Sequence, residues 1–196
     1  MFTIEHYIPA NDLENQIRSI PLLHHRDGQP VYPYEEANIS IRELAFSDVR
    51  PTSLYVVKHL LVQQEQLAND LAVAGYDPLD LDYALLVKGN NGTTGLIPPL
   101  VEMTEADGPY ILDGAHRTYR ARRLGRLTFK AICIDGVRAD CPAYALPNEW
   151  HEIQEYDDVP SDPTLKKHYR ENYRGLYRDF SALNGARLRE ANNAAI

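Results

Sequence analysis

The sequence predicts an α/β (α+β) fold in which a small mixed sheet is covered by packed helices. Polar and apolar residues alternate over residues 39–46 and again over 127–134, which is the period of a strand. Between them, apolar residues recur at helical spacing from 54 to 74, and a strand, a turn and a helix follow one another from 110 to 124. This strand–helix–strand order favours a sheet with helices packed against it.

Composition limits the class of protein. A chain of 196 residues with 44% hydrophobic content suits one domain with elaborations and a real core. The net charge of −8 argues against a large nucleic-acid footprint, so we expect DNA not to be the main partner. Cys133 and Cys141 are too few for a disulfide scaffold and are not spaced as a zinc knuckle. No leader-like start and no run of roughly 18 apolar residues is present, so the sequence predicts a cytoplasmic protein without membrane contact.

Residues 1–38 are predicted to be an N-terminal extension packed on the core, because turn-forming prolines and glycines are frequent there. A short helix is predicted over 12–20. The core is assigned to residues 39–147 and begins with the alternating strand at 39–46.

The helix predicted over 54–74 ends at Gly75, a common residue after a helix C-terminus. Its polar positions, Gln63 to Gln66, are assigned to the wetter faces of the helix. Functional residues often lie at the ends of elements, so the residues before and at the helix start are candidates for substrate binding. They are Arg50, Thr52, Ser53 and Tyr55.

Residues 76–97 are predicted to form a loop, a strand over 83–88 and a glycine-rich turn over 89–95. The turn lacks the lysine and the following helix of a P-loop, so we interpret it as a hairpin tip. A further strand is predicted over 98–103.

The most informative stretch begins with the strand formers at 110–112 and turns at Asp113-Gly114 into a helix. The first N–H groups of a helix have no intrahelical partner and carry partial positive charge, so a phosphate can bind there. His116 and Arg117 supply further donors. Five arginines lie within ten residues of this acidic chain, at 117, 120, 122, 123 and 126. The sequence therefore predicts an anion site at this turn.

The last part of the chain, residues 148–196, is assigned to a C-terminal helical segment packed on the core. Asp162-Pro163 is a strong helix start, and aromatic residues then follow at helical spacing. Arg170, Arg174 and Arg178 recur every four residues, which predicts an amphipathic helix with a solvated basic face; the alternative is that one or two of them reach the phosphate site or nucleic acid. Trp150 either stacks on a ring of a ligand or anchors this segment.

The stretch from Leu112 to Gly125, Leu-Asp-Gly-Ala-His-Arg-Thr-Tyr-Arg-Ala-Arg-Arg-Leu-Gly, resembles the Asp-Gly-x-His-Arg segment of the ParB/sulfiredoxin-like superfamily. The resemblance implies a small mixed sheet with packed helices and a loop that grips nucleotide phosphates. The upstream helix ending in glycine, the Pro-Pro strand and the apolar strand after the motif occur here in the family's order. Residues 76–97 are a departure, because the family's next strand follows the helix closely.

Within this superfamily, sulfiredoxin chemistry needs a cysteine at the position that Ala115 occupies here, so that activity is disfavoured. The partition proteins carry a helix-turn-helix DNA-binding module, and residues 135–196 show no convincing one. The motif is nearest to the free serine kinases. That resemblance implies ATP or another nucleoside di- or triphosphate with Mg²⁺, and an acceptor that is a small hydroxylated metabolite such as a free amino acid. The upstream glutamate of those kinases cannot be placed, since Asp48 and Arg50 occupy the comparable region, so the acceptor stays open.

The resemblance also implies roles for individual residues. Asp113 and His116 are the catalytic candidates, and Asp113 either orients the metal ion or accepts the acceptor's proton. The phosphate-binding candidates are Gly114, Ala115, His116, Arg117 and Arg120. The alternative is a nucleotide-responsive, ParB-like DNA-binding or regulatory protein, for which the arginine-rich helices are the support. The oligomeric state is not predicted.

Overall fold

The computed structural model describes residues 2–24, 28–89 and 92–183, and it contains helices and strands in the mixture that the sequence predicts. The strands are β1 (Thr3–Ile8), β2 (Asn38–Ala45), β3 (Arg50–Pro51), β4 (Tyr55–Val57), β5 (Ala84–Gly89), β6 (Gly92–Leu96), β7 (Leu100–Thr104), β8 (Gly108–Asp113), β9 (Thr128–Asp135), β10 (Ala145–Leu146), β11 (Gln154–Tyr156) and β12 (His168–Tyr169). The α-helices are α1 (Ala10–Arg18), α2 (Lys58–Val73) and α3 (Ala115–Arg123). The 3₁₀ helices are η1 (Trp150–Glu152), η2 (Pro163–Leu165), η3 (Tyr173–Leu176) and η4 (Phe180–Leu183).

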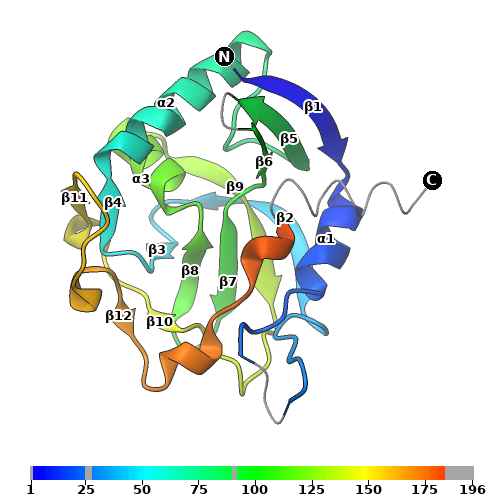
Figure 1. Ribbon diagram of the computed structural model, residues 1–196, viewed down its shortest axis with the longest axis vertical. Coiled ribbons are helices and arrows are strands. Elements are labelled where there is room, and N and C mark those ends of the chain that lie inside the picture. Colours follow the sequence, from blue (N-terminus) through cyan, green and yellow to red (C-terminus); the bar gives the residue numbers. More distant parts are fainter. Residues whose placement is uncertain (1, 25–27, 90–91, 184–196) are drawn as a thin grey trace.

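The central sheet has five strands in the order β2-β9-β7-β8-β3 (Figure 1). It is mixed, because β7 pairs parallel with β9 and antiparallel with β8. Alternation along β9 places Ile132 and Ile134 in a core cluster with α1, and Ala131 and Cys133 in a second cluster with α3. Both faces of the sheet are therefore buried, and Cys133 has the packing position that the sequence predicts.

A second sheet joins the N-terminus to the region at 76–97. Strand β1 pairs antiparallel with β5, which pairs antiparallel with β6. The strand at Thr3–Ile8 was not predicted, because it is short and its outward residues Thr3 and Glu5 are polar. Helix α1 begins two residues earlier than predicted. The hairpin at 89–95 is present as β5 and β6, and its tip at 90–91 lies outside the described residues.

The helix predicted over 54–74 is shorter than expected at its start. Tyr55–Val57 form β4, which pairs in parallel with β11 from a distant part of the chain. A partner strand supplies the backbone hydrogen bonds that a local pattern cannot show, and Val56 and Val57 are buried strand formers. Helix α2 then runs from Lys58 and ends as predicted, with Gly75 at a positive φ of 82°.

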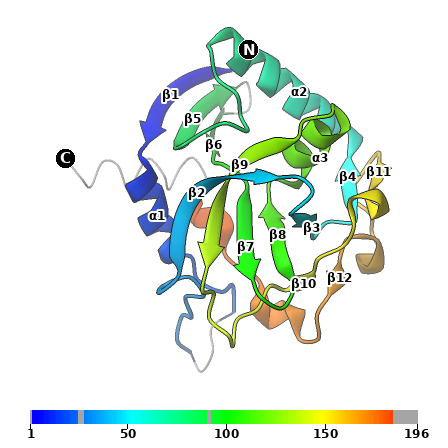
Figure 2. The same cartoon turned by 180° about the vertical axis from the view of Figure 1, so that it is seen from behind.

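The predicted C-terminal amphipathic helix is wrong for the described residues. Asp162 does accept a hydrogen bond from the Thr164 N–H at 2.8 Å, but η2 ends at Leu165. His168–Tyr169 then pair with β10, and Asn172 takes a left-handed φ of 58° that interrupts any helix. The segment, orange in Figure 1, instead lies across one face of β7 and β8, and Figure 2 shows it behind the sheet. Residues 184–196 lie outside the described residues.

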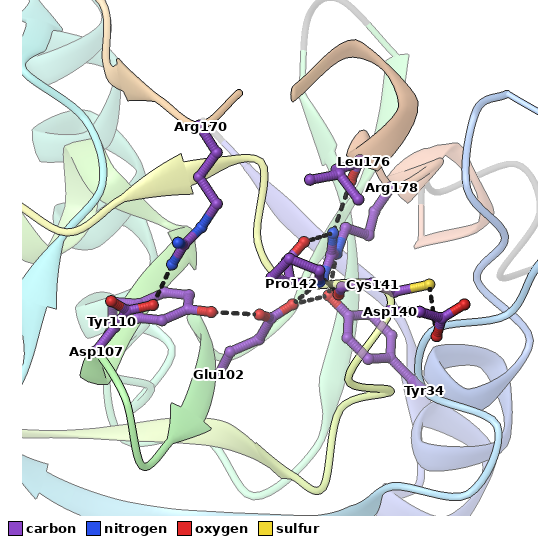
Figure 3. A network of polar contacts seen from close by, with 10 residues as sticks. All are labelled: Tyr34, Glu102, Asp107, Tyr110, Asp140, Cys141, Pro142, Arg170, Leu176 and Arg178. Carbon is purple, nitrogen blue, oxygen red and sulfur yellow. Dashed lines mark hydrogen bonds and ion pairs between the residues drawn. The ribbon is translucent and has the colours of Figure 1, made fainter. Parts of the chain in front are cut away.

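A buried polar network holds this segment to the sheet (Figure 3). Glu102 of β7 and Arg178 form an ion pair at 2.9 Å in which both side chains are 0% exposed. The Tyr34 and Tyr110 hydroxyls donate to the same carboxylate at 2.6 and 2.7 Å. The prediction of a solvated basic face is therefore wrong for Arg178, because 3₁₀ turns and strand pairing remove the four-residue periodicity.

Trp150 is an anchor rather than a stacking wall. Its ring is buried against Phe46, and its Nε1–H donates to the carbonyl oxygens of Phe46 and Val49 at 3.2 and 2.9 Å. These contacts fix η1 to the start of the core. Among the helices of the described residues, none has the length and apolar character needed to cross a membrane.

Candidate functional site

The predicted turn lies where β8 ends and α3 begins. Gly114 joins them with a left-handed φ of 91°, a conformation that other residues adopt at a cost. A Cβ at this position would lie 3.0 Å from the Cβ of Pro99 and 3.2 Å from its Cα. Both the turn and the close approach of Pro99 therefore require glycine.

The first turn of α3 offers free donors. The Thr118 N–H is bonded to the Gly114 carbonyl at 3.0 Å, so the N–H groups before it have no partner within the helix. They carry the partial positive charge of a helix N-terminus, which favours an anion at this point.

A cavity of about 290 Å³ opens at this helix start. One wall is formed by the turn itself, from Leu112 to Arg117, and the others come from α2 and β6. The residues from those two elements are Gln64, Leu67, Thr94, Gly95 and Leu96. Asp113 and His116 thus line the same accessible cavity, as the sequence predicts.

Asp113 is an uncommitted carboxylate. It is exposed, and among the described residues it makes no hydrogen bond and no ion pair. Its charge nevertheless acts on three basic side chains, His116, Arg117 and Lys167, because it raises the pKa of each against the effect of burial. A carboxylate surrounded by bases but bonded to none is available to a metal ion or a proton.

His116 is held as a neutral imidazole. The Val57 N–H donates to its Nε2 at 3.0 Å, which leaves the remaining proton on Nδ1. Burial lowers the pKa of His116, and the Asp113 charge opposes this effect in part. His116 therefore ties the start of α3 to β4, and its Nδ1–H is the donor left for a ligand.

Arg117 and Arg120 lie on successive turns of α3. Arg117 donates to the Pro78 carbonyl at 3.3 Å, and burial lowers its pKa, although a guanidinium stays charged at neutral pH. Arg120 pairs with Glu65 of α2 at 3.3 Å. Both line a second, smaller cavity of about 150 Å³, which shares Gln64 and Arg117 with the first.

The four residues predicted to bind substrate do not line these cavities. Arg50 donates to the Asp107 carbonyl, at the end of β8 opposite to Asp113. Thr52 is buried and donates to the Ile111 carbonyl at 2.8 Å. Ser53 donates to the carbonyl of Tyr55 at 2.7 Å, within the link to β4, where burial raises the pKa of the Tyr55 hydroxyl. The side chains of Arg50, Thr52 and Ser53 thus donate to backbone carbonyls, and the role of all four residues toward a substrate stays a prediction.

Two residues near the turn were not singled out from the sequence. Lys167 donates to Thr52 Oγ1 at 3.2 Å and lies over the ring of Tyr144, with its charge near that of Asp113. Gln64 reaches the cavity from α2. No local pattern marks either residue, since each is brought to the site by an element distant in sequence.

Most of the chain matches a known protein family. A sequence model of the ParB CE domain matches residues 12–154, from α1 through η1 to β11. The chain belongs to the ParB CE domain family. This ParB CE domain match includes the turn at Asp113–Arg117 and all residues that line the two cavities, but it does not single out the kinase branch. The chain matches no curated protein and no solved structure.

Proposed function

We propose that this ParB CE domain protein is a nucleotide-dependent phosphotransferase that acts on a small hydroxylated metabolite such as a free amino acid. The observation that carries the proposal is the shared cavity, which is lined by the start of α3, by Arg117 and by Asp113, whose carboxylate has no partner in the described part of the chain. Phosphoryl transfer mainly requires alignment of the reacting groups and neutralisation of charge on the transferring phosphate. This arrangement offers both.

In the proposed mechanism the N–H groups at the start of α3 and the Arg117 guanidinium hold the phosphates of ATP or another nucleotide. The acceptor's hydroxyl oxygen attacks the terminal phosphorus, and the bond from that phosphorus to the bridging oxygen breaks. The hydroxyl proton passes to the Asp113 carboxylate, or to water if Asp113 instead holds Mg²⁺. His116 contributes one donor through its Nδ1–H.

The Asp113 carboxylate is a suitable ligand for Mg²⁺. No group of three His, Cys, Asp or Glu side chains that could hold a metal occurs among the described residues. Mg²⁺ commonly binds nucleotide enzymes through one or two carboxylates together with substrate phosphates and water. Bound there, Mg²⁺ would neutralise charge on the phosphate oxygens.

A nucleotide-responsive regulatory or DNA-binding protein is the second candidate, favoured by the ParB CE domain match itself. The arginines of α3 and Arg126, which follows it, would support DNA binding, but they have partners within the protein. Arg122 lies over the Trp150 ring at 5.3 Å, Arg123 pairs with Glu155, and Arg126 pairs with Asp77. These contacts reduce the charge that the helix offers to a phosphate backbone.

Calorimetric titration with ATP, ADP and CTP in the presence of Mg²⁺, followed by mass spectrometry of incubated metabolite pools, tests the proposal. We expect nucleotide binding and a product heavier by one phosphoryl group. Salt-dependent binding to duplex DNA without any phosphorylated product would favour the regulatory candidate.

A further inference from the structure

Gln64 carries a buried polar atom with no partner. Its Oε1 is inaccessible to solvent and accepts no hydrogen bond among the described residues. Buried polar side-chain atoms are nearly always paired, because an unpaired one loses its hydration without compensation. An orphaned acceptor in the folded protein is therefore a sign that a partner is missing.

The position of Gln64 separates it from the other buried, unpaired atoms. Of the four such atoms in the described part of the chain, those of Gln16, Asn148 and Arg170 belong to residues outside both cavities. Gln64 lines both of them, and it comes from α2 rather than from the turn that begins α3. The next two polar side chains of α2 are paired, since Glu65 contacts Arg120 and Gln66 donates to Asp70.

The chemistry of the amide decides which part of a ligand it can meet. A carboxamide oxygen accepts hydrogen bonds and repels phosphate oxygens, while its NH₂ group donates. Exchanging the oxygen and nitrogen still leaves a buried polar atom of this amide without a partner among the described residues. A group that offers a donor beside an acceptor satisfies it, as the edge of a nucleobase or a ribose hydroxyl does.

The residues from α3 and from α2 that line the larger cavity therefore differ in chemistry. The start of α3 attracts phosphate, whereas Gln64 on α2 requires a neutral donor and acceptor. A nucleotide whose phosphates occupy the turn has its sugar and base beyond them, and Gln64 lines the same cavity from a different element.

We propose that Gln64 binds the nucleoside portion of the nucleotide, through a hydrogen bond to its base or ribose. The proposal rests on the proposed nucleotide-binding function and adds a site residue outside the Asp113–Arg117 turn.

The test compares Gln64→Leu with Gln63→Leu, a matched control one residue away whose side chain is exposed. Each variant is titrated with Mg²⁺ and the nucleotide, ATP or CTP, that binds the wild-type protein more tightly, and separately with Mg²⁺ and tripolyphosphate. Gln64→Leu is expected to lower nucleotide affinity about tenfold and to leave tripolyphosphate affinity unchanged. Gln63→Leu is expected to change neither.

Thermal unfolding without ligand adds an independent measurement. Leucine removes the unpaired acceptor, so Gln64→Leu is expected to unfold at the same temperature as the wild-type protein or higher. Gln64→Glu, which keeps the shape but loses the NH₂ group and adds charge, is expected to weaken nucleotide binding as well.

A wrong role for Gln64 and a wrong nucleotide-binding function give different results. If Arg117→Ala weakens nucleotide binding but Gln64→Leu and Gln64→Glu do not, the role of Gln64 is wrong and nucleotide binding stands. Equal loss of nucleotide and tripolyphosphate in Gln64→Leu also overturns it, because the residue then acts on phosphate or on the fold. A wild-type protein that binds no nucleotide overturns both proposals.

Discussion

At the scale of single residues, Arg117 and Asp113 share one cavity but are expected to do different work. Arg117→Ala removes a fixed positive donor, so nucleotide affinity should fall about tenfold or more, or roughly 1.5–3 kcal/mol for a charged hydrogen bond. Asp113→Asn keeps the size and turn-forming ability of the side chain but loses its charge. Turnover should collapse, while the fold persists and nucleotide binding changes less. Calorimetric titration and a product assay measure the two effects.

Asp48→Asn serves as the control for this comparison, because Asp48 is an exposed carboxylate that lines neither cavity. It is expected to retain turnover. Full turnover in Asp113→Asn, with loss in Asp48→Asn, would move the catalytic role to Asp48 and leave Asp113 as a turn residue.

Lys167 gives the site a pH-dependent contribution to stability. Burial lowers the pKa of Lys167 to about 8, against about 10.4 for lysine in an unfolded chain. Between these two values the unfolded state binds more protons than the folded state, so stability from this group rises with pH. Below about pH 8 both states are protonated, and the cost of burying the charge is present in full.

Lys167→Met should therefore remove that rise. Urea unfolding of both proteins from pH 7 to 9.5 is expected to show a stability difference that favours the variant at pH 7 and shrinks toward pH 9.5. Lys166→Met, at the neighbouring position, should follow the wild-type curve. Parallel curves for Lys167→Met and the wild-type protein would show that Lys167 titrates normally.

At the scale of elements, the junction of β8 and α3 depends on Gly114. Alanine there must adopt a left-handed conformation, at a cost of about 1–2 kcal/mol, and Pro99 must also give way by a few tenths of an ångström. Gly114→Ala is expected to lower both the free energy of unfolding and nucleotide affinity, because the N–H groups of the helix start move. Urea unfolding and calorimetric titration check the two losses.

Gly125→Ala is the matched control, since Gly125 also has a positive φ, of 80°, but no atom lies within 4 Å of an added Cβ. Gly125→Ala should lower the free energy of unfolding by a similar conformational cost, and it should keep nucleotide affinity. If Gly114→Ala binds nucleotide as tightly as Gly125→Ala does, the geometry of this turn is not what holds the phosphate.

At the scale of the whole molecule, the Glu102–Arg178 pair joins the C-terminal segment to the central sheet (Figure 3). Arg178→Met leaves a buried, unpaired carboxylate, which should cost about 3–5 kcal/mol of unfolding free energy. Adding Glu102→Gln removes that charge and keeps an acceptor for the tyrosine hydroxyls, so the double variant should recover part of the loss. Urea unfolding measures both, with the exposed Arg174→Met as the control. A double variant as unstable as Arg178→Met alone would show that the lost packing of Arg178 dominates.

The sequence by itself determined the features that depend on neighbouring residues. The alternating strands of the core, the stop at Gly75 and the turn at Asp113–Arg117 follow from local periodicity and from the conformational freedom of glycine. The tertiary structure decided what depends on distant partners: β4 takes its hydrogen bonds from β11, and Arg178 finds Glu102 across the fold. The sequence assigns Gln64 to a wet face of its helix, whereas in the structure it lines a cavity. The element packed against a helix decides whether a side chain faces solvent or a cavity.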